Sequence, residues 1–86
     1  MEKTVKILNE SGMHARPAGA FVKMASSFTS DIQIETNGKV LNAKSIMNVL
    51  SLGLKKDDEI KIIANGNDEK EAIEGLVNLV NSKFGE

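Results

Sequence analysis

The chain has 86 residues, 41% of them hydrophobic and 27% charged, which is typical of one small globular domain. A formal net charge of −1 and only three aromatic residues argue against nucleic acid as a partner, because nucleic-acid binding favours a basic surface and aromatic rings for base stacking. The absence of cysteine excludes disulfides and thiolate chemistry, and a single histidine argues against a metal site, so we expect neither a metal nor a cofactor.

The first residues, MEKTVKIL, lack the long apolar run of a signal peptide, and no later stretch approaches the length of a membrane span. We therefore expect one cytoplasmic domain, residues 1–86, that does not insert into a membrane.

The first predicted element is a half-buried strand over residues 3–8, in which Val5 and Ile7 share one face. The NESG segment then interrupts the alternation. From Ala15 onward, apolar residues recur at steps of three and four, which predicts an amphipathic helix. Its apolar stripe comprises Ala18, Phe21 or Val22, Ala25 and Phe28.

Three more segments alternate between polar and apolar residues, namely 31–36, 39–42 and 59–64. The first two are joined by Asn37-Gly38, and Asn-Gly is the strongest local signal for a hairpin because both turn residues must accept a positive φ. We therefore predict a hairpin followed, after an intervening segment, by a fourth strand.

The segment between the hairpin and the fourth strand predicts a helix of about two turns, with Ser45 as its N-cap and Gly53 as its stop. A buried strand is the alternative, since apolar periodicity alone does not separate the two. A last helix is predicted over residues 69–86, with a capping box formed by Asp68 and Glu71. Its apolar stripe comprises Ile73, Leu76, Val77, Val80 and Phe84.

The predicted order is strand, helix, strand, strand, helix, strand, helix. Each strand has one apolar and one polar face, so one side of the sheet is dry and the other faces water. This pattern predicts an α+β fold in which an antiparallel sheet carries helices on a single side.

The segment GMHARPAGAF contains the only histidine, arginine and proline of the chain. His14 directly precedes the first predicted helix, and Pro17 is tolerated in its first turn because an N–H there has no intrahelical partner to lose. The same turn presents unpaired N–H groups and the positive end of the helix dipole, which favours an anion. Arg16 adds a forked set of donors suited to phosphate oxygens.

A positive neighbourhood should favour the neutral form of the His14 ring at pH 7, leaving a lone pair on one nitrogen. That nitrogen can attack a phosphoryl group that arrives among donors already aimed at it. No nucleophile–base pair and no Gly-rich phosphate loop accompanies it. The residues therefore favour a protein that holds a phosphoryl group and is not an enzyme. The alternative is that His14 is only a polar residue at the start of a helix, with no role in chemistry.

GMHARPAGAF and NAKSIMNVLSLG resemble the active-site and regulatory-serine segments of HPr, the family of histidine-containing phosphocarriers of the phosphoenolpyruvate-dependent sugar phosphotransferase system. The resemblance extends over essentially the whole chain, and length and element order agree with it. It implies an open-faced β-sandwich, βαββαβα, with a four-stranded antiparallel sheet and three helices on one face.

The resemblance also implies a role for each residue of the first motif. His14 would accept a phosphoryl group on Nδ1 from phosphorylated enzyme I and pass it to enzyme IIA domains, with the guanidinium of Arg16 beside it and Pro17 shaping the start of the helix. No metal takes part.

For the second motif, the resemblance implies regulatory phosphorylation of Ser45 by an ATP-dependent HPr kinase/phosphorylase. The modified protein would transfer phosphate more slowly and act as a corepressor with a catabolite-control transcription factor. The alternative is that Ser45 only caps a helix, the commonest use of serine at such a position.

The short helix is also where the resemblance places a docking surface for these partners. Met47 suits a surface that serves several partners, because its flexible thioether can repack; the alternative for each of these apolar residues is a place in the core. Asn48 stands where the family pattern has glycine, which bears on partner preference. The predicted contact residues are Ala15, Ala20, Ile46, Met47, Asn48, Leu50 and Leu52.

Two other functions remain as alternatives. One is a regulatory binding module that does not carry phosphate, against which His14 argues, because regulatory relatives of the family replace that residue. The other is a carrier in a parallel nitrogen-linked relay, which would share the chemistry and differ in partners. We expect a monomer in either case.

Overall fold

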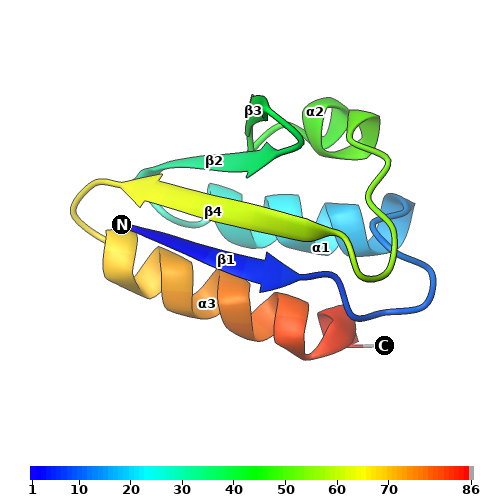
Figure 1. The fold of residues 1–86 in the computed structure, drawn as a ribbon. Coiled ribbons are helices and arrows are strands. Elements are labelled where there is room, and N and C mark those ends of the chain that lie inside the picture. The colour runs from blue at the N-terminus through cyan, green and yellow to red at the C-terminus, as the bar shows by residue number, and fades with distance from the viewer. Residues whose placement is uncertain (86) are drawn as a thin grey trace.

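The computed structural model describes residues 1–85, and its elements follow the predicted order. All strand pairs are antiparallel, and the sheet order is β1-β4-β2-β3. The helices lie on one side of this sheet, so the open-faced sandwich is confirmed (Figure 1). The elements are β1 (Glu2–Lys6), α1 (Ala15–Ser26), β2 (Asp31–Thr36), β3 (Lys39–Asn42), α2 (Ile46–Ser51), β4 (Glu59–Asn65), α3 (Glu69–Asn81) and a short 3₁₀ turn, η1 (Lys83–Gly85).

β4 lies in the middle of the sheet and sets the register of the core. Ile62 is opposite Lys3 of β1 on one side and Ile34 of β2 on the other. Because side chains alternate along a strand, the predicted apolar faces of β1, β2 and β4 point toward the helices, whereas β3 contributes no buried residue. The core on this side includes Val5, Ile7, Phe21, Ile32, Ile34, Ile60, Ile62, Leu76 and Val80.

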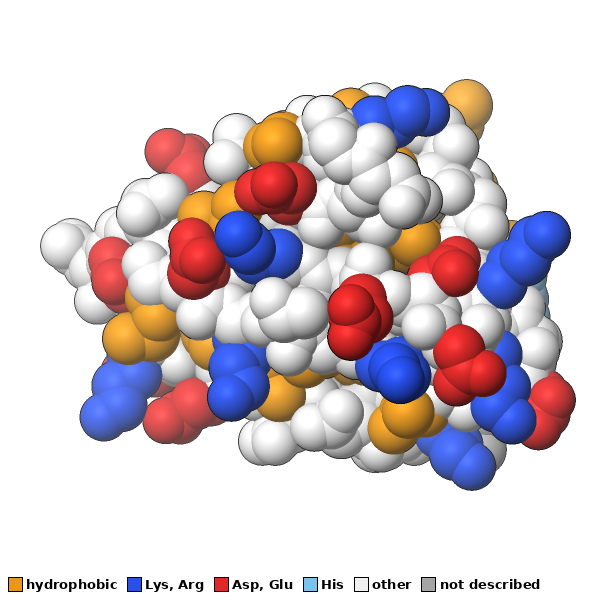
Figure 2. Space-filling model, viewed as in Figure 1, with side chains coloured by type: hydrophobic (Ala, Val, Ile, Leu, Met, Phe, Trp, Pro, Cys, Tyr) orange, Lys and Arg blue, Asp and Glu red, His pale blue; other side chains and the backbone are white. Residues whose placement is uncertain are grey.

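The opposite face of the sheet is open to solvent and carries mixed charges. Figure 2 shows acidic and basic side chains interspersed over this face. Lys61 on the central strand lies 3.4 Å from a carboxylate oxygen of Glu2 and 3.9 Å from one of Glu35, on the two neighbouring strands. Cross-strand pairs of opposite charge such as these stabilise a sheet modestly.

The hairpin turn has the predicted geometry. Asn37 has φ 50° and Gly38 has φ 78°, and Thr36 pairs with Lys39 directly behind them. Two positive φ values in a two-residue loop match the twist of the flanking strands, which explains why Asn-Gly occupies these positions.

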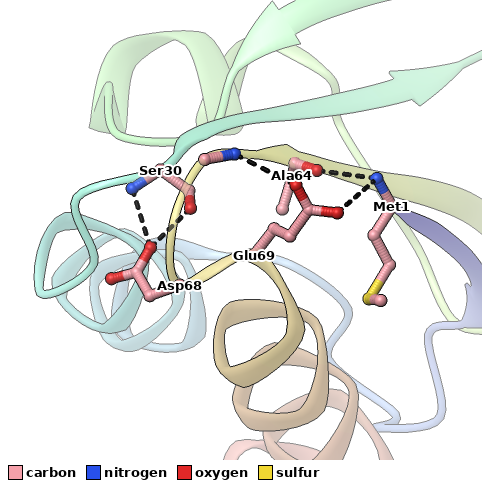
Figure 3. Close-up of polar contacts among 6 residues, drawn as sticks. Met1, Ser30, Ala64, Asp68 and Glu69 are labelled. Atoms are coloured by element: carbon pink, nitrogen blue, oxygen red, sulfur yellow. Dashed lines mark hydrogen bonds and ion pairs between the residues drawn. The ribbon is translucent and has the colours of Figure 1, made fainter.

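The predicted capping box at α3 is wrong. Asp68 precedes the helix, but its carboxylate makes no cap hydrogen bond to it. It instead accepts hydrogen bonds from the amides of Thr29 (2.8 Å) and Ser30 (2.9 Å) and from the Ser30 hydroxyl, as Figure 3 shows for Ser30. Asp68 therefore ties α3 to the loop between α1 and β2, a contact between distant parts of the chain.

Glu69, the first residue of α3, makes a local hydrogen bond with the backbone three residues before it. Its carboxylate accepts a hydrogen bond from the amide of Gly66 (3.2 Å) and lies 3.3 Å from the ammonium of Met1, which also donates to the carbonyl of Ala64 (Figure 3). The hydrogen bond from Gly66 is the main reason that the pKa of Glu69 is lowered, and the ammonium adds to it.

The ends of several elements differ from the prediction, including α1, which ends at Ser26 before Phe28 of its predicted stripe, and β4, which ends at Asn65 rather than residue 64. β1 ends at Lys6 rather than residue 8, although Ile7 is still hydrogen-bonded to the segment before β4. α3 ends at Asn81, because Lys83 and Phe84 both take φ 58°, and Phe84 is buried from η1 rather than from the helix. The predicted helix end at residue 86 lies outside the described residues.

Candidate functional site

The loop from β1 to α1 is held by the segment that precedes β4. The amide of Ile7 donates to the carbonyl of Asp58 (2.9 Å), and the amide of Asp57 donates to the carbonyl of Ile7 (2.7 Å). Further along, the amide of Met13 donates to the carbonyl of Leu54 (2.9 Å). The loop is thus anchored at both ends just before it delivers His14 to the start of α1.

Gly12 is the residue that lets these two segments approach each other. Its φ is +67°, and a Cβ at this position would lie 2.5 Å from the carbonyl oxygen of Leu54 and 2.9 Å from the Cα of Lys55. Both observations require glycine. Its amide donates to the carbonyl of Asn9 (3.1 Å), which closes a four-residue turn ahead of the site.

His14 is the N-cap of α1, as predicted. Its backbone is extended (φ −81°, ψ −170°), and its carbonyl accepts the first hydrogen bond of the helix, from the amide of Ala18 (2.9 Å). Its side chain is exposed and does not cap the helix. The ring is therefore at the surface, where a protein partner can reach it.

The first turn of α1 follows His14 directly. Pro17 is buried and has no N–H, and Ala18 already donates to His14. The amides of Ala15 and Arg16 are the ones that have no acceptor within the helix. Ala15 and Arg16 are both exposed residues. No acidic residue stands in this turn to compete for them.

On the outer side of the Asn9–Gly12 turn, Lys56 donates a hydrogen bond to Glu10 (2.8 Å). This bond lowers the pKa of Glu10 and raises the pKa of Lys56. Both side chains are exposed, so the pair adds little to the stability of the loop.

The second motif forms the predicted helix rather than the alternative strand. Ser45 has extended backbone geometry, and its hydroxyl accepts a hydrogen bond from the amide of Asn48 (3.3 Å). Gly53 follows with φ +58°, the left-handed geometry expected at a helix end. Ser45 is half-buried and caps a helix of six residues.

α2 divides its apolar residues between the core and solvent. Val49 is buried, and Leu52 packs against the core. Ile46 (37% exposed), Met47 (74%) and Leu50 (37%) instead face outward. These three form what we call the α2 patch. Of the other predicted contact residues, Ala15 is exposed, and Ala20 and Asn48 are half-buried.

The two motifs lie together in space. α1 packs against α2, and the hydrogen bond from Met13 to Leu54 joins the start of α1 to the segment just after α2. A surface hollow of about 490 Å³ lies away from this site, on the open face of the sheet beside Asn37 and Lys61. The His14 site is therefore an exposed surface that suits a protein partner better than an enclosed small substrate.

Within residues 1–85, no group of three metal-ligating side chains comes together. None of the helices in this range combines the length and the apolar character needed to cross a bilayer.

The sequence analysis missed the side chain of Asn9. It is 2% exposed, and its Nδ2 donates to the carbonyl of Gly12 (2.7 Å) and to the hydroxyl of Ser11 (3.3 Å). An asparagine three residues before a glycine is a recognised turn signal that could have drawn attention to it. Nothing in the local pattern indicates that the side chain is buried.

Comparison with known proteins gives a consistent picture. Residues 1–82 match the family model described as "PTS HPr component phosphorylation site". The structure of HPr-C-His from Thermoanaerobacter tengcongensis is 51% identical with a TM-score of 0.97, and the match covers 100% of this chain and 97% of that one. The phosphocarrier protein HPr from Bacillus anthracis is 42% identical with a TM-score of 0.89, covering 93% and 95% of the two chains.

A third similar structure bears a name that refers to catabolite repression. It is Crh of Bacillus subtilis, described as a domain-swapped dimer. It is 44% identical with a TM-score of 0.77, and the match covers 92% of this chain and 91% of that one.

Proposed function

The chain belongs to the HPr family of phosphocarrier proteins, and on this basis we propose that it carries a phosphoryl group on His14 in the phosphoenolpyruvate-dependent sugar phosphotransferase system. It takes the group from phosphorylated enzyme I and gives it to enzyme IIA domains. In this role it is a protein substrate of its partners rather than an enzyme.

The observation that carries the proposal is an exposed imidazole at the N-cap of a helix whose first turn also exposes Arg16. The Nδ1 lone pair of the neutral ring attacks phosphorus, and the bond from phosphorus to enzyme I breaks as the new P–N bond forms. The ring proton on Nε2 can then leave to water. The amides of Ala15 and Arg16 and the guanidinium of Arg16 receive the phosphoryl oxygens.

Pro17 supports this arrangement without contacting the phosphoryl group. Its fixed φ suits the first turn, and its lack of an N–H costs no helical hydrogen bond there. The stabilisation of the phosphohistidine must stay moderate, because a carrier that held the group too firmly could not pass it on.

The experiment mixes the protein with phosphoenolpyruvate and catalytic amounts of enzyme I. We expect one phosphoryl group that is labile in acid and stable in alkali, as a phosphohistidine is. His14→Ala should abolish it, whereas Ser45→Ala should leave it in place. A phosphate that persists in His14→Ala would contradict the proposal.

A second role, in carbon catabolite regulation, is favoured by the similarity to Crh. We propose Ser45 as the acceptor for an ATP-dependent HPr kinase/phosphorylase and a catabolite-control transcription factor as the partner of the modified form. Phosphate at the N-cap of α2 is compatible with the helix dipole, so it would act by repelling acidic groups on enzyme I rather than by unfolding α2.

Regulation on Ser45 is tested separately from phosphate transfer. Incubation with ATP and the kinase should give an acid-stable phosphate that is lost in Ser45→Ala and kept in His14→Ala. The same phosphoprotein should accept phosphate from enzyme I more slowly. If its rate is unchanged, Ser45 does not regulate the relay.

We propose the α2 patch, with the neighbouring Ala15, Ala20, Asn48 and Leu52, as the surface on which enzyme I and the IIA domains dock. A carrier that visits soluble partners in turn is expected in the cytoplasm and as a monomer. Sedimentation at micromolar concentration tests the latter, and the domain-swapped dimer of Crh is the assembly against which it should be compared.

A further inference from the structure

The turn that precedes the site is closed on both sides by one residue. The carbonyl of Asn9 accepts a hydrogen bond from the amide of Gly12 (3.1 Å), and the side-chain Nδ2 of Asn9 donates to the carbonyl of Gly12 (2.7 Å). Nδ2 also reaches the hydroxyl of Ser11 (3.3 Å). Asn9 thus holds both the amide and the carbonyl of a residue that stands two positions before His14.

The orientation of the Gly12 carbonyl has direct consequences for His14. That carbonyl and the amide of Met13 belong to the same planar peptide unit, and the amide donates to Leu54 (2.9 Å). The peptide plane between Gly12 and Met13 is therefore fixed at its oxygen by Asn9 and at its nitrogen by Leu54. From this fixed plane the backbone runs through Met13 to His14, whose carbonyl accepts the first hydrogen bond of α1 from Ala18.

The side chains of Glu10 and Ser11, in the same turn, are exposed. Gly12 itself is the most conformationally permissive residue type, and the Glu10–Lys56 pair on the outside is exposed. Asn9 is the one side chain in this turn that is both buried (2% exposed) and hydrogen-bonded to the backbone ahead of the site. A buried amide has to be satisfied, so its bonds are costly to break.

We propose that Asn9 is a positioning residue for phosphoryl transfer: it locks the Gly12–Met13 peptide and thereby the direction in which the His14 ring meets its partner. The inference rests on the proposed function of His14. Loss of the lock would let the ring sample other directions, and misplacement of a reacting group by about 1 Å can reduce a rate by about a hundredfold.

The test compares Asn9→Leu with a matched control, Thr36→Val. Asn9→Leu keeps the branching of the side chain at Cγ, although it is larger, and removes the donor. Thr36 is also buried, and its hydroxyl donates to the carbonyl of Glu59 (2.9 Å) at the hairpin, so Thr36→Val removes one buried hydrogen bond away from His14. Asn9→Ala is the second variant, because it removes the same donor without adding apolar atoms.

Two measurements are made on each variant: the midpoint of denaturant unfolding, and the rate of phosphorylation by enzyme I as a function of the variant's concentration. We expect both Asn9 variants to lower kcat by about tenfold or more, with KM for enzyme I changed by less than about twofold, because the α2 patch is untouched. Thr36→Val should lower the unfolding midpoint and leave kcat at the wild-type value.

The outcomes distinguish the positioning role of Asn9 from the proposed transfer of phosphate through His14. If wild-type protein accepts phosphate and the Asn9 variants keep its kcat, or change only KM, then Asn9 does not position the ring. If Thr36→Val lowers kcat as much as Asn9→Leu, the effect reflects general loss of stability and the inference fails. If the wild-type protein accepts no phosphate from enzyme I, the proposed function fails and this inference falls with it.

Discussion

Gly12 brings two backbone segments closer together than any other residue type would allow. The carbonyl oxygen of Leu54 lies only 2.5 Å from where a Cβ would be, and the positive φ would strain a side chain even in open space. Gly19, within α1, is the opposite case, since nothing lies within 4 Å of its missing Cβ. Contacts with Leu54 therefore require glycine at position 12, whereas no contact requires glycine at position 19.

Alanine at these two positions should therefore shift stability in opposite directions. Gly12→Ala should lower the free energy of unfolding by roughly 1–3 kcal/mol, because the backbone near Leu54 must move. Gly19→Ala should raise it by about 0.5–1 kcal/mol, because alanine restricts the unfolded chain and suits a helix. Urea unfolding of the two variants measures both effects, and a shift of the same sign would contradict this account.

Among the elements, the start of α3 is hydrogen-bonded through one carboxylate to the loop between α1 and β2. The hydroxyl of Ser30 and the amides of Thr29 and Ser30 all donate to Asp68. These bonds favour the ionised form, and they lower the pKa of Asp68 to about 2, from an ordinary value of 3.8.

Asp68→Asn should consequently destabilise the protein in a manner that depends on pH. A carboxyl whose pKa is lower in the folded state contributes its full stabilisation above pH 3.8 and loses it as the pH falls toward about 2. The unfolding midpoint of the variant should be below that of wild type at pH 7 and should converge with it near pH 2. Glu71→Gln, in the same helical turn but outside this network, is the control and should show no such convergence. A difference between Asp68→Asn and wild type that stays constant with pH would contradict the assignment.

α2 shows how one short helix can serve both the core and the surface. Val49 is 1% exposed, whereas Met47, two positions away, is 74% exposed. A change at Met47 should therefore affect docking without affecting folding.

Met47→Ala should change the free energy of unfolding by less than about 0.5 kcal/mol, as is usual for surface positions. It should raise KM for phosphorylation by enzyme I while leaving kcat unchanged, because His14 keeps its position. Thermal unfolding and initial-rate kinetics test the two parts. An unchanged KM would remove Met47 from the proposed docking surface.

In the whole molecule, stability rests on one layer of side chains between the sheet and the helices. The core joins the inner faces of β1, β2 and β4 to the apolar stripes of α1 and α3, which Figure 1 shows on one side of the sheet. A small domain of this kind has a total stability of only about 5–15 kcal/mol. The other face of the sheet contributes little to stability, because it is charged and exposed to solvent.

Leu76→Ala should accordingly remove a large part of the stability. Leu76 is fully buried on α3, and truncation of a buried leucine costs about 2–5 kcal/mol through lost transfer energy and the cavity left behind. Guanidinium unfolding measures the loss. A loss below about 1 kcal/mol would mean that the core collapses around the gap.

Much of this fold and site could be predicted from the sequence because the deciding interactions are local. Alternation marked the strands, Asn37-Gly38 marked the hairpin, and Ser45 marked the start of α2. The position of His14 at the N-cap of α1 could be predicted because the change of period begins at Ala15, and a proline in the first turn agrees with it. Each of these signals depends on residues within a few positions of one another.

Tertiary structure decided the features that depend on distant partners. Asp68 had the spacing of a capping box, but the amides of Thr29 and Ser30 bind its carboxylate more favourably than the end of its own helix. The burial of Asn9 depends on how the loop before α1 meets the segment before β4, which no local pattern encodes. Local residues determine the elements and the position of the reactive ring in the chain. Contacts between elements determine which residues hold that ring in position.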